Sequence, residues 1–511
     1  MPPPRTDTAS TRSRARVLVP GQRVRPGDAA APKAPPAEHF WRTLLPVLAL
    51  LTAVTRLPSF ARPVWNPDEG FLATQARQLA AGGTLYETVV DRKPPLVPWL
   101  YRGAFALFGD GSLWPLRVAA ALAALAGAVL LASLARRRWG VRAGRTAGVL
   151  HLLLSVGLVP EDTQAATFEV FMVPCTVLAM WCADRGRWAC AGLGVASAVL
   201  AKQTGGAVLV PVLWLLWQSR AGAWAALRVL ACAALPVLCA AAAFGPSRFA
   251  YWMATGSGSY LSADGAAAHA LLRASGNGGL LLLACLPLIP AVVRALRGRP
   301  LPQSADVWVW LAASGAAVAV GLQFYGHYFL QLVPALALSG AAALHRTEGG
   351  RPHARRAAVA VALTAALASG FLAWAWLAPR AELGHQQRLA AEVRARTSPD
   401  DRVLLWGMHP EGYWFADRPP ASRYLTAGFL TNYSGGRDGA RAGERYAMEG
   451  AWPYFRRELR RRPPALVVDD SRGKSYRMSR VPTLRSCLRR HFVRAGTVDG
   501  AVLYVRTPEG R

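Results

Sequence analysis

The sequence predicts an α-helical polytopic membrane protein with about eleven transmembrane helices and a small α/β domain at its C-terminal end. Composition is the first observation: of 511 residues, 53% are hydrophobic and 17% are charged, whereas soluble domains carry about 25% charged residues. The second is that the apolar residues gather in stretches long enough to cross a bilayer. The third is a drop in hydropathy after about residue 379. Collagen, a long coiled coil, a disordered chain and a small disulfide scaffold are excluded.

The chain opens with residues 1–39, which are rich in proline, alanine and arginine and predict a disordered, basic cytoplasmic tail. The first apolar run starts too late for a cleaved signal peptide. A membrane domain is predicted over residues 40–379, and the two short spans that flank Lys202 can be broken or tilted. Its predicted spans are 40–57, 113–135, 143–160, 166–183, 188–201, 205–218, 228–245, 279–296, 305–322, 328–344 and 356–378.

The positions of the charges orient these spans. The chain has 59 Lys and Arg residues against 29 Asp and Glu residues, a net charge of +30. With the N-terminus inside, 24 cations lie in the tail and inner loops and ten on the outer side of the membrane domain, as the positive-inside rule expects. Nine of the twelve acids between residues 43 and 379 lie outside or near outer helix ends. The charge therefore indicates how the chain is oriented in a membrane, and nucleic acid is not an expected partner.

Residues 380–511 are predicted to form the extracytoplasmic α/β domain. Three short strand-like runs alternate there with helical and loop patterns: Val403–Trp406, Ala465–Val468 and Ala501–Val505. This segment holds 25 cations, and long domains cross a membrane largely regardless of charge. Six of the seven cysteines lie in apolar runs, so no disulfide framework or CxxC metal site is predicted.

The longest loop of the membrane domain, residues 58–112, carries the first functional motif. Asn66 is a good helix cap, Pro67 suits a first helical position, and Asp68 and Glu69 suit the positive end of a helix dipole. Capping alone explains these residues. It does not explain why acidic and basic side chains then gather on one face of the bilayer, where the loop continues through Asp91, Arg92, Lys93, Pro94 and Pro95.

Further ionisable residues lie near the outer ends of later spans. Asp162 is in a tight second outer loop, and Glu169 follows about two turns onward. An ionisable group inside a span is a functional candidate, although helix capping is an alternative for these acids. Lys202 can instead extend its amine to the interface, and His327 with Tyr328 equally suits an interfacial aromatic belt.

Taken in order, these motifs resemble the polytopic glycosyltransferases of the GT-C superfamily, in the branch of protein O-mannosyltransferases and lipid A aminoarabinose transferases, which is like bacterial glycosyltransferase family 39. The resemblance begins with Pro-Asp-Glu-Gly at residues 67–70 and Lys-Pro-Pro-Leu at 93–96. It continues through residues 167–172, 200–203 and 327–334, and covers roughly residues 55–345. It implies a GT-C-like membrane domain with its catalytic first outer loop at residues 58–112.

The resemblance also implies an activity and site residues. Such an enzyme, a hexosyl- or pentosyltransferase, passes a sugar from a polyprenyl-monophosphate donor to a glycan, lipid or protein acceptor on the outer side of the cytoplasmic membrane, with inversion. By correspondence, Asp68 is the general base, and Glu69 supports it electrostatically or orients the acceptor. Two further sets follow. The donor phosphate is assigned to Lys93, Lys202, His327 and Tyr328, and the second acid or acceptor contact to Asp162, Glu169 or Asp91. These carboxylates can hold a divalent cation at the phosphate, which the sequence does not require.

One residue departs from the family pattern, and two other functions compete with this interpretation. Arg92 occupies a position where some aminoarabinose transferases carry an acid, which argues against a lipid A acceptor or a shared metal site. Richness in alanine, arginine and glycine suggests a high-GC bacterial source, in which decaprenyl phosphate is a plausible carrier. The alternative is a transporter or flippase for envelope lipid or sugar precursors, and a third is a non-catalytic scaffold. A transporter is expected to show mid-membrane polar groups and internal repeats, and no convincing repeat is found.

Overall fold

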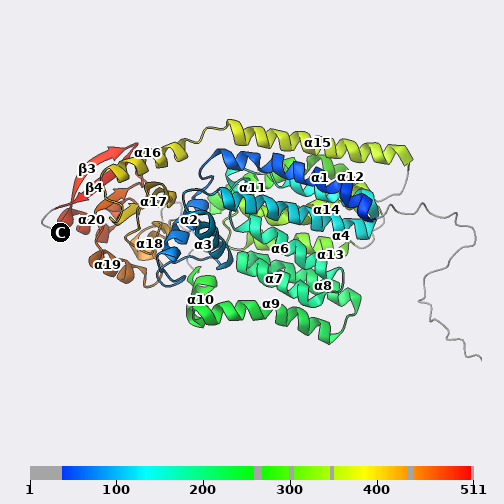
Figure 1. Cartoon of the computed structure of the whole chain (residues 1–511), viewed down its shortest axis with the longest axis horizontal. Coiled ribbons are helices and arrows are strands. Elements are labelled where there is room, and N and C mark those ends of the chain that lie inside the picture. The colour runs from blue at the N-terminus through cyan, green and yellow to red at the C-terminus, as the bar shows by residue number, and fades with distance from the viewer. Residues whose placement is uncertain (1–36, 258–266, 299–303, 346–349, 434–440, 508–511) are drawn as a thin grey trace, which may run out of the picture.

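The computed structural model describes residues 37–257, 267–298, 304–345, 350–433 and 441–507. Most of the predicted cytoplasmic tail, residues 1–36, lies outside this part of the chain. Figure 1 shows a bundle of helices that run along the long axis of the molecule, and beside one end of the bundle a smaller region that contains the strands.

The bundle has the character of a polytopic membrane protein. Six helical segments are long and apolar enough to cross a membrane, and four shorter apolar helices accompany them among the described residues. The eleven-span count stays a prediction. The helices of the bundle are α1 (Ala37–Arg56), α4 (Trp114–Leu154), α6 (Phe168–Ala183), α7 (Trp188–Ala201), α8 (Leu209–Ser219), α9 (Ala223–Phe244), α11 (Ala267–Cys285), α12 (Ile289–Arg297), α13 (Ala305–Ala319), α14 (Val333–Leu344) and α15 (Gly350–Leu377).

Helix α4 contains two of the predicted spans, and Gly140 separates them. Its φ of 89° and ψ of 179° are non-helical, in a region of φ that favours glycine. The second half then folds back on the first: a Cβ at Gly144 would lie 2.8 Å from the carbonyl oxygen of Ala132, and one at Gly148 would lie 3.1 Å from that of Ala128. Small residues let the two halves approach closely. The 41-residue helix is therefore a hairpin of two helices.

A second break occurs where the sequence predicts short spans. Helix α7 ends at Ala201, and Lys202 adopts an extended backbone with φ −157° and ψ 136°. The 3-10 helix η2 (Gln203–Val208) then leads into α8. This break lies beside the loop of residues 58–112, because Nε2 of Gln203 donates to the carbonyl of Arg92 at 2.6 Å.

Short elements cover the end of the bundle that adjoins the strand-containing region. The loop of residues 58–112 contains two helices, α2 (Pro67–Ala80) and α3 (Leu96–Phe108). The remaining elements at this end are η1 (Leu57–Ala61), α5 (Pro160–Thr163), α10 (Pro246–Met253), η3 (Thr255–Ser257) and η5 (Gly326–Leu332), whereas η4 (Leu286–Leu288) joins α11 to α12 within the bundle. Most of the predicted site residues lie on these elements or at the adjoining helix ends.

The C-terminal region contains a four-stranded sheet with the order β1-β2-β4-β3. Strands β1 (Val403–Trp406) and β2 (Leu466–Asp469) are parallel, and β4 (Ala501–Arg506) pairs antiparallel with β2 and with β3 (Phe492–Val498). The three predicted strand-like runs correspond to β1, β2 and β4, whereas β3 is not predicted. The helices of this region are α16 (Ala381–Ala395), α17 (Glu411–Ala416), α18 (Gly428–Thr431), α19 (Ala451–Arg461) and α20 (Pro482–His491), with short η6 (Glu444–Tyr446) and η7 (Met478–Arg480).

Candidate active site

The N-terminus of α2 presents Asp68 at the end of the bundle. Asn66 caps this helix as its sequence predicts: Oδ1 accepts the backbone N–H of Glu69 at 3.1 Å, and Pro67 occupies the first turn. The Nδ2 of Asn66 donates to the carbonyl of Glu161 at 3.0 Å. The Asp68 side chain is 43% exposed. The cap thus joins the first predicted outer loop to the second and leaves Asp68 accessible.

Glu69, the next residue, is fully buried. Its Oε2 accepts from the backbone N–H of Trp65 at 2.7 Å and from Nη2 of Arg117 at 3.2 Å. Its Oε1 accepts from the backbone N–H of Ala166 at 2.7 Å. Both oxygens accept hydrogen bonds from protein donors, so Glu69 ties the start of α2 to Arg117 and to the backbone of Ala166. Its predicted role beside Asp68 stays a prediction.

His327 connects three acids. Its Nδ1 lies 2.6 Å from Oδ1 of Asp162, and its Nε2 lies 3.9 Å from Oδ2 of Asp68 and 3.9 Å from Oε1 of Glu169. The imidazole stacks on the ring of Tyr325 with a centroid separation of 5.5 Å. Because Nδ1 is held by a carboxylate, the ring orientation is fixed and Nε2 points between the other two acids.

Glu169 also forms a buried ion pair with Lys202. The Nζ of Lys202 lies 3.7 Å from the ring centroid of Tyr328, close enough for a cation–π interaction. The other carboxylate oxygen of Glu169, Oε2, is buried and has no hydrogen-bond partner among the described residues. We call Asp68, Asp162, Glu169, Lys202 and His327 the central charge cluster.

Lys93 approaches this cluster from the loop between α2 and α3. Its Nζ lies 5.4 Å from the ring centroid of Phe168 and 5.9 Å from that of Tyr328. The hydroxyl of Tyr86 donates to the Lys93 carbonyl at 2.8 Å and holds the loop. Both Lys93 and Lys202 therefore face the ring of Tyr328. Lys93 and Asp68 both interact electrostatically with Lys202, so the first-loop acid and the first-loop lysine share one site.

Asp91 is buried beside this loop and accepts from Nε2 of Gln75 at 3.4 Å. Burial raises the pKa of Asp91 to about 7, and the charge of Asp68 adds to this effect while the charge of Lys93 opposes it. Asp91 is consequently a carboxyl that changes protonation near neutral pH. The structure thus brings every candidate residue except Glu69, which contacts Arg117 and Ala166 instead, to one group of side chains.

Two residues of this region escaped the sequence reasoning. Arg117 is buried and pairs with Glu69, and a charged residue within an apolar span was the signal for it. Gly326 is the second: a Cβ there would lie 2.2 Å from Oδ2 of Asp162. A glycine directly before His327 therefore lets the backbone approach the carboxylate that holds the histidine.

The C-terminal region packs directly against α2. A Cβ at Gly70 would lie 2.3 Å from Cβ and 2.5 Å from Cα of Glu411 in α17. The hydroxyl of Thr74 donates to the carbonyl of Pro410 at 3.2 Å, and Nη1 of Arg77 donates to that of Trp414 at 3.1 Å. We call this contact the α2–α17 seam. It begins two residues after Asp68, so the C-terminal region helps to hold the helix that presents this acid.

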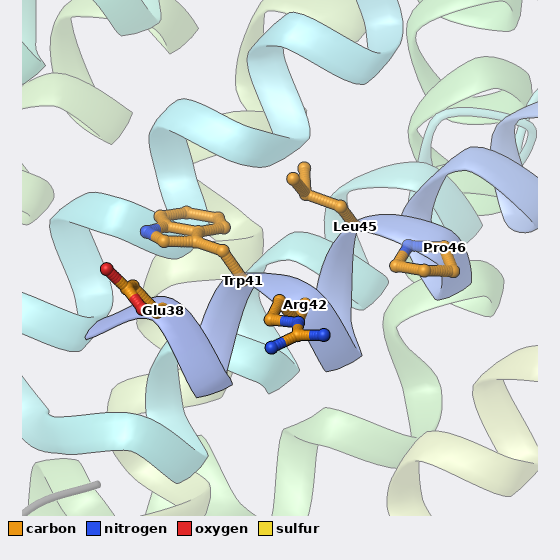
Figure 2. A pocket seen from close by; sticks show the side chains of 5 residues that line it. All are labelled: Glu38, Trp41, Arg42, Leu45 and Pro46. Atoms are coloured by element: carbon orange, nitrogen blue, oxygen red, sulfur yellow. The ribbon is translucent and has the colours of Figure 1, made fainter. Parts of the chain in front are cut away.

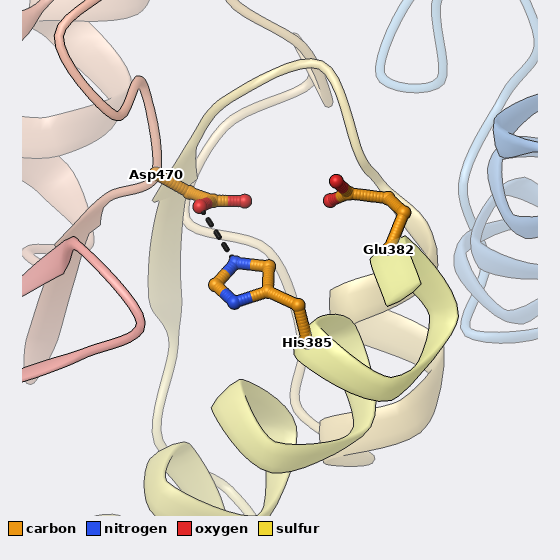
Figure 3. Close-up of side chains that lie close together, drawn as sticks. All are labelled: Glu382, His385 and Asp470. Atoms are coloured by element: carbon orange, nitrogen blue, oxygen red, sulfur yellow. Dashed lines mark hydrogen bonds and ion pairs between the residues drawn. The ribbon is translucent and has the colours of Figure 1, made fainter. Parts of the chain in front are cut away.

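A second group of titratable side chains lies within the C-terminal region (Figure 3). Potential metal-ligand atoms of Glu382, His385 and Asp470 lie within 4.8 Å of one another. Their acceptors already have protein partners: Gln386 Nε2 donates to Asp470 at 2.8 Å and to Glu382 at 3.0 Å, and Arg472 pairs with Glu382 at 2.8 Å. We call these five residues the C-terminal ion network. Its donor set fits a cation, but both of its carboxylates already pair with Arg472.

A surface hollow lies elsewhere, along the first turns of α1 (Figure 2). It is lined by Glu38, Trp41, Arg42, Leu45 and Pro46, all from this one helix. Helix α1 has 20 residues, so its start lies about 30 Å from the end that leads toward α2. This hollow is therefore separate from the central charge cluster.

A family model described as dolichyl-phosphate-mannose-protein mannosyltransferase matches residues 92–252, the segment that contains Lys93, Asp162, Glu169 and Lys202. No curated protein matches the chain closely enough to count as a relative.

Two solved structures share the fold over most of the chain. The crystal structure of ArnT from Cupriavidus metallidurans bound to undecaprenyl phosphate has a TM-score of 0.59 at 16% identity, over 92% of this chain and 99% of that one. The archaeal oligosaccharyltransferase AglB from Archaeoglobus fulgidus, in complex with an inhibitory peptide and a dolichol-phosphate, has a TM-score of 0.50 at 12% identity, over 93% of this chain and 75% of that one. The resemblance to the ArnT and protein mannosyltransferase branch of the GT-C superfamily is thus confirmed.

Proposed function

We propose that this protein transfers a sugar from a polyprenyl-monophosphate donor to an acceptor of the cell envelope, with inversion at the sugar carbon. One observation carries the proposal: Asp68, Asp162, Glu169, Lys202 and His327 meet in the central charge cluster although they come from distant parts of the chain. The family match and the ArnT-like fold support the same chemistry.

Asp68 is the general base in this mechanism. Its carboxylate takes the proton of the acceptor hydroxyl as the acceptor oxygen bonds to the anomeric carbon of the sugar. The bond between that carbon and the phosphate oxygen breaks, and its electron pair leaves with the polyprenyl phosphate. Asp68 suits this role because its side chain is accessible, whereas Glu69 beside it is fully buried.

The departing phosphate requires positive charge, which Lys93, Lys202 and His327 supply. Lys93 and Lys202 both face the Tyr328 ring, and Asp162 fixes the orientation of His327. Fixed cations stabilise charge that develops in the transition state without having to reorganise. The buried Oε2 of Glu169 has no hydrogen-bond partner among the described residues, and it is suited to accept a hydrogen bond from a hydroxyl of the donor sugar. Asp91 adjusts the charge beside Lys93.

The same proposal includes the arrangement in the membrane. Eleven spans place the N-terminus inside and residues 380–511 outside, with the central charge cluster at the outer interface of a plasma membrane. The donor tail then stays in lipid while its phosphate meets the cluster. A high-GC bacterial origin favours decaprenyl phosphate as the carrier. The transferred sugar is a hexose or a pentose, and the acceptor is a glycan, a lipid or a protein.

The direct test is transfer by the full-length protein in lipid nanodiscs. Radiolabelled decaprenyl-phosphate sugars, each supplied with an envelope fraction as acceptor, are compared for wild type, Asp68→Asn and Glu87→Gln. We expect Asp68→Asn to lower the transfer rate by at least about 100-fold while donor binding remains. Glu87→Gln is the matched control, because Glu87 is an exposed carboxylate of the same loop that pairs with Arg248.

The outcomes separate the enzyme from the transporter. Equal transfer by wild type and Asp68→Asn contradicts the assignment of the base. Failure to transfer from any donor, together with flux of the donor across reconstituted vesicles, contradicts the enzyme and favours the transporter or flippase. Charged groups at helix ends, as in the central charge cluster, favour the enzyme because a transporter places its polar groups near mid-membrane.

A further inference from the structure

The C-terminal region carries a positively charged surface that the transfer mechanism does not use. Helices α19 and α20, with the residues that flank them, hold nine exposed arginines. These residues, which we call the basic face, are Arg456, Arg457, Arg460, Arg461, Arg462, Arg485, Arg489, Arg490 and Arg494. Within residues 451–462 and 482–494 the only acid in the sequence is Glu458. Its carboxylate accepts hydrogen bonds from Oγ of Ser422 at 2.8 Å and from Nε of Arg423 at 2.6 Å. It therefore does not neutralise the arginines of the basic face.

The two helices form one surface. Glu444 bridges them, because its carboxylate accepts from Nη2 of Arg456 at 2.9 Å and from the backbone N–H of Thr483 at 3.1 Å. Phe455 of α19 and Leu484 of α20 are both buried in the same hydrophobic core. The arginines of both helices are therefore held on one scaffold.

The spacing of the arginines concentrates their charge. Arg457 and Arg461 are four residues apart on α19, and Arg485 and Arg489 are four apart on α20. Residues at this spacing are neighbours on a helix surface, and like charges there destabilise the helix. A bound polyanion removes this repulsion, and guanidinium groups bind phosphate and carboxylate through paired hydrogen bonds.

The position of the basic face restricts its partner. In Figure 1, α19 and α20 lie at the end of the molecule that is farthest from the membrane bundle. Lipid headgroups lie at the ends of the bundle helices, so α19 and α20 are displaced from them along the long axis of the molecule. Charge complementarity then favours a polymer that extends away from the membrane.

We propose that the basic face binds an anionic polysaccharide of the cell envelope, which carries carboxylate or phosphodiester groups along its length. This inference rests on the outer placement of residues 380–511 in the proposed function, and it does not depend on sugar transfer.

Binding is measured with full-length protein in phosphatidylcholine nanodiscs, using polygalacturonate as the probe and dextran of similar length as the neutral polymer. We expect polygalacturonate alone to bind, and its affinity to fall by at least about tenfold between 50 and 200 mM salt. The R485Q/R489Q/R490Q variant is expected to bind about tenfold more weakly.

The matched control is R388Q/R394Q/R396Q, which removes the same charge from α16 of the same region. Arg388 and Arg396 already pair with Asp499 and Glu392, and Arg394 donates to the Phe415 carbonyl. We expect this variant to keep its affinity within about twofold. Thermal melting of both variants in nanodiscs verifies that each is folded.

Three results would overturn the proposal: equal binding of dextran and polygalacturonate, equal losses in the two triple variants, or binding of phosphatidylglycerol vesicles without binding of polygalacturonate. The last result would assign the face to lipid. Loss of transfer with polygalacturonate binding intact would instead contradict the proposed function alone.

Discussion

Two groups of histidine and carboxylate side chains differ in how completely their hydrogen bonds are filled. In the C-terminal ion network, Asp470 accepts from Gln386 at 2.8 Å and lies 2.9 Å from His385. In the central charge cluster, Nε2 of His327 lies 3.9 Å from each of two carboxylates. The two groups contain the same types of residue, so residue type does not distinguish them. They differ in how many polar atoms lack a hydrogen-bond partner, which is informative because buried polar groups normally have one.

This difference assigns separate roles to the two groups. A filled network gains stability from fixed partners and has little capacity left for a ligand. The central charge cluster keeps an accessible acid in Asp68 and, within the described part of the chain, an oxygen of Glu169 without a hydrogen-bond partner. We therefore expect substitutions in the C-terminal ion network to change stability, and substitutions in the central charge cluster to change the reaction rate.

The largest contrast is expected from the same substitution at two histidines. His327→Gln removes the cation that faces the departing phosphate, and we expect the transfer rate to fall by about 100-fold with a small change in Tm. His385→Gln breaks the contact with Asp470 and is expected to lower Tm by about 2–4 °C with little change in rate. The transfer rate and the Tm of both variants are measured in nanodiscs. A loss of Tm without loss of rate in His327→Gln, together with a loss of rate without loss of Tm in His385→Gln, would contradict the comparison.

Gly70→Ala tests whether the two regions are coupled through the α2–α17 seam. The added Cβ meets the backbone of Glu411, so α2 or α17 must shift. A displacement of about 1 Å at the base lowers the rate by up to about 100-fold. Gly103→Ala on the neighbouring helix α3 is the control, because a Cβ there has open space. Transfer at the wild-type rate by Gly70→Ala would show that the seam does not position Asp68.

The smallest effect concerns pH. Because burial raises the pKa of Asp91 to about 7, the folded protein binds more protons than the unfolded chain between about pH 4 and pH 7. The stability that Asp91 contributes is present below its ordinary pKa and is lost as pH rises through 7. We expect Asp91→Asn to flatten the decrease in Tm over this range relative to wild type. Parallel Tm–pH profiles would contradict the raised pKa.

Local features of this fold could be predicted from the sequence. The helix start at Asn66 and Pro67 follows from capping preferences, and the three strand-like runs follow from β-branched and apolar residues. Strand β3 could not be predicted, because exposed residues and a register shift near Gly496 obscure its pattern. Its pairing with β4 is set by the turn at Asp499 and Gly500, both with positive φ.

The candidate site could be predicted as a set of residues, but its contacts could not. Whether Asp162 or Glu169 is the second acid was open, and the structure brings both to His327. Arg117 lies 48 residues from its partner Glu69, and Gly70 meets a helix that follows it by more than 300 residues. Such pairings depend on tertiary packing, which local periodicity does not encode.

A cryo-electron-microscopy structure of the protein with decaprenyl phosphate in nanodiscs tests the central claim most directly. We predict that the phosphate lies within hydrogen-bonding distance of Lys93, Lys202 or His327, with Asp68 on the side where an acceptor would enter. A phosphate bound at Arg472 in the C-terminal ion network, or anywhere away from the central charge cluster, would contradict the claim.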